Sequence, residues 1–317
     1  MRQFTRHLLL FIVTCLLGAF AVVFIERMIL NNQKHFVLPE NKRYVFLGHS
    51  HAQAAYNDQL IDSALNLASS GEAYFYTYIK LDKILESNAD KKVVFIEYAN
   101  NNIFPEMNNW IWDDIHIQDR YKLYSPFTGI RDTRFLYSKN PKAALISNIK
   151  SIVNNVYYIF SLKNISVDQK MGGYEDLVRD KTDSLLGVLS RNPKQTISDT
   201  SFSEANVAYL KKMIQACNQK GVGVYLIRSP LHHQYEGLQN EKKFQEILHN
   251  ELKPAELLDF RNYPLSNAEF GDLEHANYKG AKKYSLFINK LLKLGLLKKS
   301  SKQKFINEQI ANEKGVQ

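Results

Sequence analysis

The strongest constraint on the fold of this chain is an alternation of short apolar runs with longer amphipathic stretches. Runs of this kind are typical of strands that are buried on both faces of a parallel sheet, and the stretches between them have helical periodicity. The sequence therefore predicts an α/β protein with a parallel five-stranded sheet and helices on both faces. The five predicted strands are Arg43–Leu47, Ala64–Ala68, Lys92–Tyr98, Val222–Arg228 and Glu256–Phe260.

The predicted helices lie between and after these strands, near Asp58–Ser63, Glu72–Ser87, Ser203–Lys220, Gln239–Asn250 and Tyr278–Leu297. Residues 101–200 interrupt the alternation. They are rich in asparagine and aromatic residues, and a further helix is predicted at Pro141–Leu162. We interpret this stretch as a mostly helical insertion that covers one end of the sheet rather than as a second domain. Its Tyr157, Tyr158 and Phe160 could bind a substrate, but we favour packing onto the core.

The N-terminus carries a feature of its own, an uncharged run at residues 8–25 that follows a short head with Arg2 and Arg6. As a helix this run would cover roughly 27 Å, which is just enough to cross a bilayer. A cleaved signal peptide is the alternative, but the run ends in Val22-Val23-Phe24-Ile25-Glu26-Arg27 and offers no small-x-small cleavage site. We therefore predict an uncleaved transmembrane signal anchor.

The predicted organisation is a head at 1–7, the anchor at 8–25, a linker at 26–42, an α/β domain at 43–297 and a basic polar tail at 298–317. Basic residues lie on both sides of the anchor, so charge alone does not fix its orientation. The shortness of the head favours a single-pass inner-membrane protein with its domain outside the cytoplasm.

Composition narrows the function classes. The 41 Lys+Arg against 32 Asp+Glu give a net charge of +9, and nine of the lysines lie between Ala276 and Asn307. No recognised nucleic-acid motif accompanies them, so we predict no nucleic-acid partner and interpret the lysines as a solvated face that could also hold anionic lipid or glycan. The two cysteines, Cys15 and Cys217, supply neither a disulfide framework nor a zinc ribbon.

Polar residues at the ends of the predicted strands carry the chemistry. Strand 43–47 runs directly into Gly48-His49-Ser50-His51, and Asp272 precedes His275 by three residues after the last strand. The carboxyl ends of parallel strands are where open α/β sheets bind ligands. A serine hydroxyl needs a neighbouring base, and the Asp-x-x-His spacing lets the carboxylate accept from Nδ1–H while Nε2 faces outward. Alone, Ser50 could cap a helix and the Asp–His pair could lie on the surface.

Two further strand ends offer hydrogen-bond donors for a developing oxyanion. Gly71 follows the second strand and presents an unobstructed backbone amide, and Asn100, Asn101 and Asn102 follow the third strand with side-chain amides.

A serine after the first strand, a glycine after the second, an asparagine after the third and Asp-x-x-His before the last helix resemble the SGNH (GDSL-like) hydrolase superfamily, in its membrane-anchored cell-envelope branch. The resemblance covers roughly residues 43–297. It implies a three-layer, flavodoxin-like αβα fold, with Ser50 as nucleophile, His275 and Asp272 as base and orienting carboxylate, and Gly71 with one of Asn100, Asn101 and Asn102 as oxyanion donors. The usual G-D-S is Gly48-His49-Ser50 here, and Ala99-Asn100-Asn101-Asn102 replaces G-x-N-D.

The histidines permit other interpretations. His49 and His51 form an H-x-H pair that resembles the closing motif of metallophosphoesterases, but the upstream metal-binding motifs of that family are missing, so we predict no metal and no cofactor. His49, His51 and His232 are candidates for contact with substrate, with a hydrogen-bonded loop histidine as the simpler role for His232.

The resemblance implies a serine esterase, an acyl hydrolase or an O-acyltransferase that removes or transfers a small acyl group, acetyl by preference, on an envelope carbohydrate. Its expected partners are the membrane and an acylated carbohydrate or other ester, with a membrane acyltransferase as a further candidate. The alternative is a non-catalytic scaffold of the same fold that binds polysaccharide or a partner acyltransferase.

Overall fold

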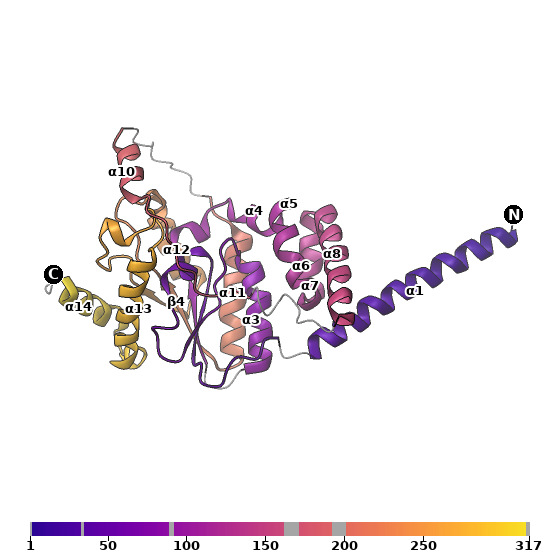
Figure 1. The fold of residues 1–317 in the computed structure, drawn as a ribbon, viewed down its shortest axis with the longest axis horizontal. Helices are drawn as coiled ribbons and strands as arrows, with labels where there is room; N and C mark the ends of the chain where they lie inside the picture. The colour runs from indigo at the N-terminus through magenta and orange to yellow at the C-terminus, as the bar shows by residue number, and fades with distance from the viewer. Residues whose placement is uncertain (1, 33–34, 89–91, 162–170, 192–200, 315–317) are drawn as a thin grey trace. The chain divides into compact units, whose positions relative to one another are not determined.

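The computed structural model describes residues 2–32, 35–88, 92–161, 171–191 and 201–314. Contacts divide the chain into two compact units (Figure 1). Unit 1 comprises Met1–Val37 and Trp112–Lys170, and unit 2 comprises Leu38–Ile111 and Met171–Gln317. The predicted insertion at about 101–200 is thus shared, because residues 112–170 group with the N-terminal segment and the remainder groups with the sheet.

Unit 2 contains a five-stranded, all-parallel sheet in the order β2-β1-β3-β4-β5, which confirms the predicted fold class. This is the strand order of flavodoxin-like folds. The strands are short apolar runs, as expected for strands covered on both faces. They are β1 (Tyr44–Leu47), β2 (Ala64–Asn66), β3 (Val93–Glu97), β4 (Gly223–Arg228) and β5 (Glu256–Asp259).

Helices cover both faces of this sheet. Phe46 of β1 and Phe95 of β3 pack into one core cluster with α2 (Ser50–Ala55) and α13 (Tyr278–Lys293). The opposite face is covered by α3 (Tyr74–Asn88) and α11 (Glu204–Gln219), which the figure places on the other side of β4 from α13 (Figure 1). The remaining elements of unit 2 are η1 (Asn100–Ile103), α4 (Met107–Trp112, whose last residue belongs to unit 1), α10 (Thr182–Arg191), η4 (Glu236–Asn240), α12 (Glu241–Glu251), η5 (Asn267–Glu269), η6 (Leu296–Lys298) and α14 (Lys302–Lys314).

Two local predictions are wrong, and one helix was missing from the predicted set. Residues 58–63 form turns rather than a helix, because Asn57 Oδ1 accepts from Gln59 N and Asp58 Oδ2 accepts from Asn66 N. Helix α2, which begins at Ser50 itself, was not among the predicted helices. The predicted polar tail at 298–317 contains α14, whose Ile306 and Ile310 are buried in the core cluster.

Unit 1 is helical, and its first element is the long helix α1 (Arg2–Asn32). This is the one helix among the described residues that is long and apolar enough to cross a membrane, a test that an N-terminal signal sequence also passes. The other elements are α5 (Asp114–His116), η2 (Ile117–Tyr121), α6 (Lys122–Tyr124), η3 (Ser125–Phe127), α7 (Ile130–Lys139) and α8 (Pro141–Phe160).

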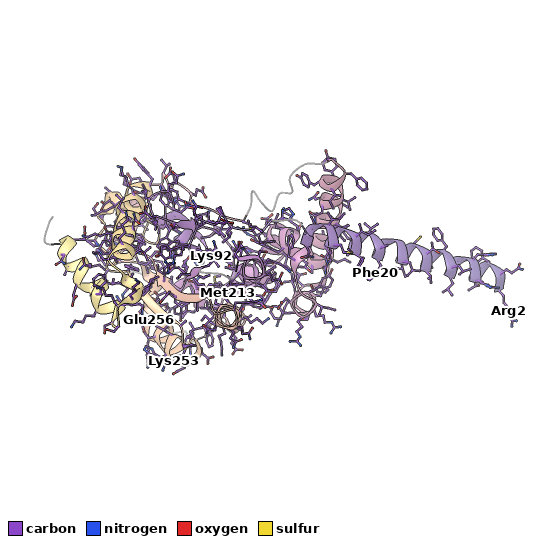
Figure 2. The ribbon with its side chains drawn as sticks, turned by 90° about the horizontal axis from the view of Figure 1, so that it is seen from below. Arg2, Phe20, Lys92, Met213, Lys253 and Glu256 are labelled. Carbon is purple, nitrogen blue, oxygen red and sulfur yellow. The ribbon has the colours of Figure 1, made fainter. Side chains whose placement is uncertain are left out.

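The end of α1 belongs to the packed part of unit 1. Glu26 and Leu30 are buried, Arg27 Nη2 donates to the carbonyl of Ser125 over 3.1 Å, and Asn155 Nδ2 of α8 donates to Glu26 Oε1 over 2.6 Å. The 8–25 portion, in contrast, leaves its large apolar side chains exposed, as the side chain of Phe20 illustrates (Figure 2). The predicted packing of the 157–160 aromatic cluster is wrong in part, because Tyr157 is 60% exposed and Phe160 is 85% exposed.

Candidate active site

Ser50 is the first residue of α2 and lies three residues after the end of β1. The turn between them is possible because Gly48 has a φ of +150°, which L side chains rarely adopt. An added Cβ at this position would lie 2.4 Å from Cβ of Glu97, the last residue of β3. This backbone conformation and this close contact therefore require glycine at position 48. The sharp turn leaves Ser50 half-buried beside the ends of β1 and β3.

His275 brings an imidazole to Ser50 from a segment 225 residues further along the chain. Its Nε2 lies 2.8 Å from Ser50 Oγ, and its Nδ1 lies 2.9 Å from Asp272 Oδ1 and 3.1 Å from Oδ2. Asp272 Oδ1 also accepts from the backbone N–H groups of Glu274 and His275, at 2.9 and 2.8 Å. This turn fixes the carboxylate beneath the imidazole, so that the serine, histidine and aspartate form a continuous hydrogen-bonded line.

Besides His275, the carboxylate of Asp272 has a second partner, a charged one, which the sequence did not indicate. Burial alone would raise the pKa of this carboxyl, but its hydrogen bonds and attraction to His275 hold the pKa well below the usual value. Arg179 Nη1 also donates to Asp272 Oδ2, from a segment that packs on the same turn through the bond from Lys181 N to Gly271 O. The carboxylate therefore stays ionised next to His275.

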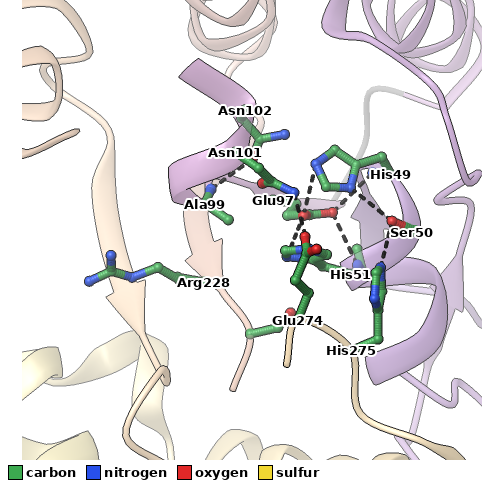
Figure 3. A network of polar contacts seen from close by, with 12 residues as sticks. His49, Ser50, His51, Glu97, Ala99, Asn101, Asn102, Arg228, Glu274 and His275 are labelled. Atoms are coloured by element: carbon green, nitrogen blue, oxygen red, sulfur yellow. Dashed lines mark hydrogen bonds and ion pairs between the residues drawn. The ribbon is translucent and has the colours of Figure 1, made fainter. Parts of the chain in front are cut away.

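The structure separates the three asparagines of the 100–102 segment. Asn100 is fully buried on the side of β4, where its Oδ1 accepts from Arg228 and its Nδ2 donates to Asn240 and Glu241. Asn102 Oδ1 accepts from the backbone N–H of Ala99. Asn101 is the one of the three that lies near Ser50, where its Nδ2 is 3.1 Å from His51 Nε2 (Figure 3).

Gly71 occupies the loop after β2, with a φ of +71°. Backbone and side-chain bonds hold this loop against the one that carries the serine: Ser69 N donates to Gly48 O over 3.0 Å, and Ser70 N donates to Gln53 Oε1 of α2 over 2.8 Å. The loops after β1 and β2 are thus tied together at the same edge of the sheet.

A buried cluster of two imidazoles and one carboxyl lies beside the serine (Figure 3). Glu97 Oε2 accepts from the backbone N–H groups of His49 and Ala52, and Oε1 lies 3.3 Å from His49 Nε2 and 3.5 Å from His51 Nδ1. Burial raises the pKa of Glu97, lowers that of His51, and lowers that of His49 to about 3. His49 is therefore uncharged at neutral pH, and its Nδ1 is 3.4 Å from Ser50 Oγ.

Glu274 lies at the side of this cluster that is nearest to His275. Its Oε2 lies 3.3 Å from His51 Nε2, and the ring of His51 meets that of His275 edge to face at 4.7 Å. Burial would raise the pKa of Glu274, but the hydrogen bond and charge interactions with His51 lower it. Sequence reasoning assigned Glu274 no role and did not identify Glu97, because one acidic residue at the end of an apolar strand gives no local sign of its partners.

His232 lies outside this cluster. Its Nε2 is 3.2 Å from Asn267 Oδ1, its Nδ1 accepts from Gln234 N, and its backbone N–H donates to Leu273 O. With Leu231, Tyr263 and Phe270 it lines a cavity of about 480 Å³. Within the described parts of the chain, no group of three or more His, Cys, Asp or Glu side chains is arranged to hold a metal ion.

Comparison with known proteins adds one match. A protein-family model whose description states no function matches residues 174–296, less than half of the chain. The matched part includes β4, β5 and the Asp272–His275 turn, but not Ser50. None of the curated proteins matches this chain.

Proposed function

We propose that this protein is a membrane-anchored serine hydrolase or acyltransferase of the SGNH type. The observation that carries the proposal is the line from Ser50 Oγ to His275 Nε2 at 2.8 Å and from His275 Nδ1 to Asp272 Oδ1 at 2.9 Å. In this arrangement the base can take the serine proton, and an ionised carboxylate stabilises the imidazolium that results.

The reaction follows from these contacts. Ser50 Oγ attacks the carbonyl carbon of an ester while its proton passes to His275 Nε2, and a tetrahedral oxyanion forms. The N–H groups of Ser50 and Gly71 and the side-chain amide of Asn101 are the donors for this oxyanion. His275 then returns the proton to the departing alcohol, which leaves an acyl-serine. A water molecule or a sugar hydroxyl, deprotonated by His275, releases the acyl group and restores Ser50.

The resemblance to SGNH enzymes is supported by the places of its motifs in the fold. The serine follows β1, the glycine follows β2, the asparagine follows β3, and Asp-x-x-His precedes α13. We further propose, from the resemblance and the anchor, that the acyl group is acetyl on an envelope carbohydrate. Hydrolase and transferase differ only in the acceptor that resolves the acyl-serine, so both stay within the proposal.

The packing of α1 supports an anchor that is retained. Residues directly after the apolar run are part of unit 1, since Glu26 bonds to Asn155 and Leu30 is buried. Cleavage near residue 25 would remove the apolar run. The residues that make these contacts would then lie at a new, charged N-terminus. We propose a single span with the α/β unit outside the cytoplasm.

A fluorophosphonate probe tests the chemistry directly. The full-length protein in detergent micelles is expected to be labelled, because the probe needs an activated serine. Ser50→Ala is expected to abolish labelling, and Ser301→Ala, an exposed serine far along the chain in unit 2, is expected to retain it. An unlabelled wild-type protein, or equal labelling of Ser50→Ala, would contradict the proposal and favour a non-catalytic scaffold of the same fold.

A further inference from the structure

Helix α8 carries its large apolar side chains on its exposed face, opposite the face that packs within unit 1. Its buried positions are occupied by small or polar residues: Ala143, Ala144, Ser147, Ser151 and Asn155. A helix that covers a core in water has the opposite arrangement. The exposed residues, which we call the apolar face of α8, are Leu145 (52%), Ile146 (36%), Ile149 (53%), Val153 (61%), Tyr157 (60%) and Phe160 (85%).

This face is one continuous stripe. Its members recur mostly at intervals of three or four residues, so they lie above one another along one side of the helix. Contiguous apolar patches on the surface of a protein usually mark a site of contact with another protein or with a membrane.

The position of α8 next to α1 indicates that a membrane, rather than another protein, covers the apolar face of α8. Asn155, near the end of α8, donates to Glu26, the first charged residue after the uncharged run of α1. Within unit 1, α8 runs across the base of α1 rather than alongside its length (Figure 1). When α1 stands across a bilayer, α8 consequently lies along the bilayer surface, at the level where the apolar run ends.

The charges of α8 agree with this position. The helix contains Lys142 and Lys150 and no acidic residue. Lysines can keep their ammonium groups in the headgroup layer while their stems lie on apolar surface, and they attract anionic lipid headgroups. Aromatic residues such as Tyr157 favour the same interfacial layer.

We propose that α8 is an interfacial helix whose apolar face is immersed in the lipid of the bilayer that α1 spans. The proposal rests on α1 as a retained anchor and is independent of the chemistry at Ser50. A helix of this kind would hold unit 1 against the membrane at a fixed height, with two contacts where α1 alone provides one.

Nitroxide accessibility in the full-length protein tests the proposal. Cys15→Ser and Cys217→Ala remove the natural thiols, and Val153→Cys and Ile149→Cys then place single spin labels on the apolar face of α8. The matched control is Asn154→Cys, an exposed polar position on the flank of the same helix. The protein is reconstituted at one molecule per nanodisc of phosphatidylethanolamine with a minor share of phosphatidylglycerol, and collisions with oxygen and with a water-soluble nickel chelate are measured.

Labels at 149 and 153 are expected to collide more often with oxygen, which concentrates in lipid, than with the nickel chelate, and the label at 154 is expected to show a lower ratio. Equal ratios at all three positions would overturn the proposal, because the apolar face would then lie in water. Labels at 149 and 153 that are shielded from both reagents would also overturn it, because protein rather than lipid would then cover the helix.

Discussion

Two imidazoles, those of His275 and His49, lie close to Ser50. The carboxyl group that contacts each imidazole distinguishes their roles. His275 Nε2 is 2.8 Å from Oγ, and His49 Nδ1 is 3.4 Å away. The carboxyl behind His275 has a lowered pKa and is ionised, whereas burial raises the pKa of Glu97, the carboxyl behind His49. An ionised carboxylate stabilises the imidazolium that forms when a histidine takes the serine proton. The shorter contact with Ser50 and the ionised Asp272 therefore support His275 as the proposed base, whereas His49 is uncharged at neutral pH.

The asparagines give the first prediction at the residue scale. Asn101→Ala removes the amide proposed to stabilise the oxyanion, so kcat for an ester substrate is expected to fall by about 10²–10³ with little change in the free energy of unfolding. Asn100→Ala is the matched control one residue away. It deprives the buried Arg228 of one partner, so it is expected to lower stability by about 1–3 kcal/mol. Steady-state kinetics and urea unfolding of both variants measure the difference, and equal losses of kcat would contradict the assignment of Asn101.

The second residue-scale prediction concerns pH. Burial lowers the pKa of His49 to about 3 in the folded protein, while in the unfolded chain it is ordinary. Below the unfolded pKa, the unfolded state binds a proton that the folded state does not, so the contribution of His49 to stability is present above that pKa and is lost as pH falls. Between pH 7 and pH 5 the wild type is expected to lose about 2 kcal/mol relative to His49→Gln.

Urea unfolding at each pH measures this difference. Trp110, whose ring centroid is 6.1 Å from that of His49, serves as the fluorescent reporter in a Trp112→Phe background. Glu97 and His51 are present in both proteins, so the comparison isolates His49. Parallel pH profiles for wild type and His49→Gln would show that His49 is protonated in the folded state.

The sequence predicted the three members of the serine–histidine–aspartate line, because each has a recognisable place at a strand end or a helix start. It could not choose among Asn100, Asn101 and Asn102, since consecutive residues in a 3₁₀ turn point in different directions that only the packing of β4 and α12 determines. Arg179 was missed because its contact with Asp272 spans 93 residues and follows no local pattern.

At the scale of elements, the β1–α2 turn depends on Gly48. The strands were predicted to within two residues, because a buried strand reveals itself by its apolar run. Helix α2 was not predicted, since SHAQAA is short and its alanines and serine indicate no periodicity. Two backbone N–H groups at the start of the helix donate to the carboxyl of Glu97 in the neighbouring strand and stabilise it. They belong to His49, directly before the helix, and to Ala52, its third residue. This tertiary contact is invisible in the local sequence.

Gly48→Ala tests this dependence. The new Cβ would meet Glu97 at 2.4 Å in a backbone conformation that alanine adopts at a cost, so stability is expected to fall by about 1–3 kcal/mol and fluorophosphonate labelling of Ser50 to slow. Gly187→Ala in α10 is the control, because a Cβ there meets nothing within 4 Å and alanine favours a helix. Thermal unfolding and labelling rates measure both effects. Unchanged values for Gly48→Ala would show that the turn relaxes without disturbing the serine.

At the scale of the whole molecule, the grouping of the chain into units depends on contacts distant in sequence. The bond between Glu26 and Asn155 joins residues 129 positions apart, and it makes the end of α1 part of unit 1 rather than a free linker. No pattern within residues 26–42 indicates this. The apolar run of α1, in contrast, was evident from the sequence alone, because its length and lack of charge need no partner to be recognised.

The orientation of α1 is the last prediction. Arg2 and Arg6 precede the span, and Arg27 follows it but donates to Ser125 O within unit 1. We expect the N-terminus to be retained in the cytoplasm, with both units outside. In spheroplasts that express a cysteine-free background, a membrane-impermeant maleimide is expected to label Glu308→Cys, an exposed position of α14, without lysis. Gln3→Cys should be labelled only after the membrane is permeabilised. The reverse result would place the Ser50 site in the cytoplasm and remove envelope carbohydrate as its substrate, while the serine chemistry itself would be unaffected.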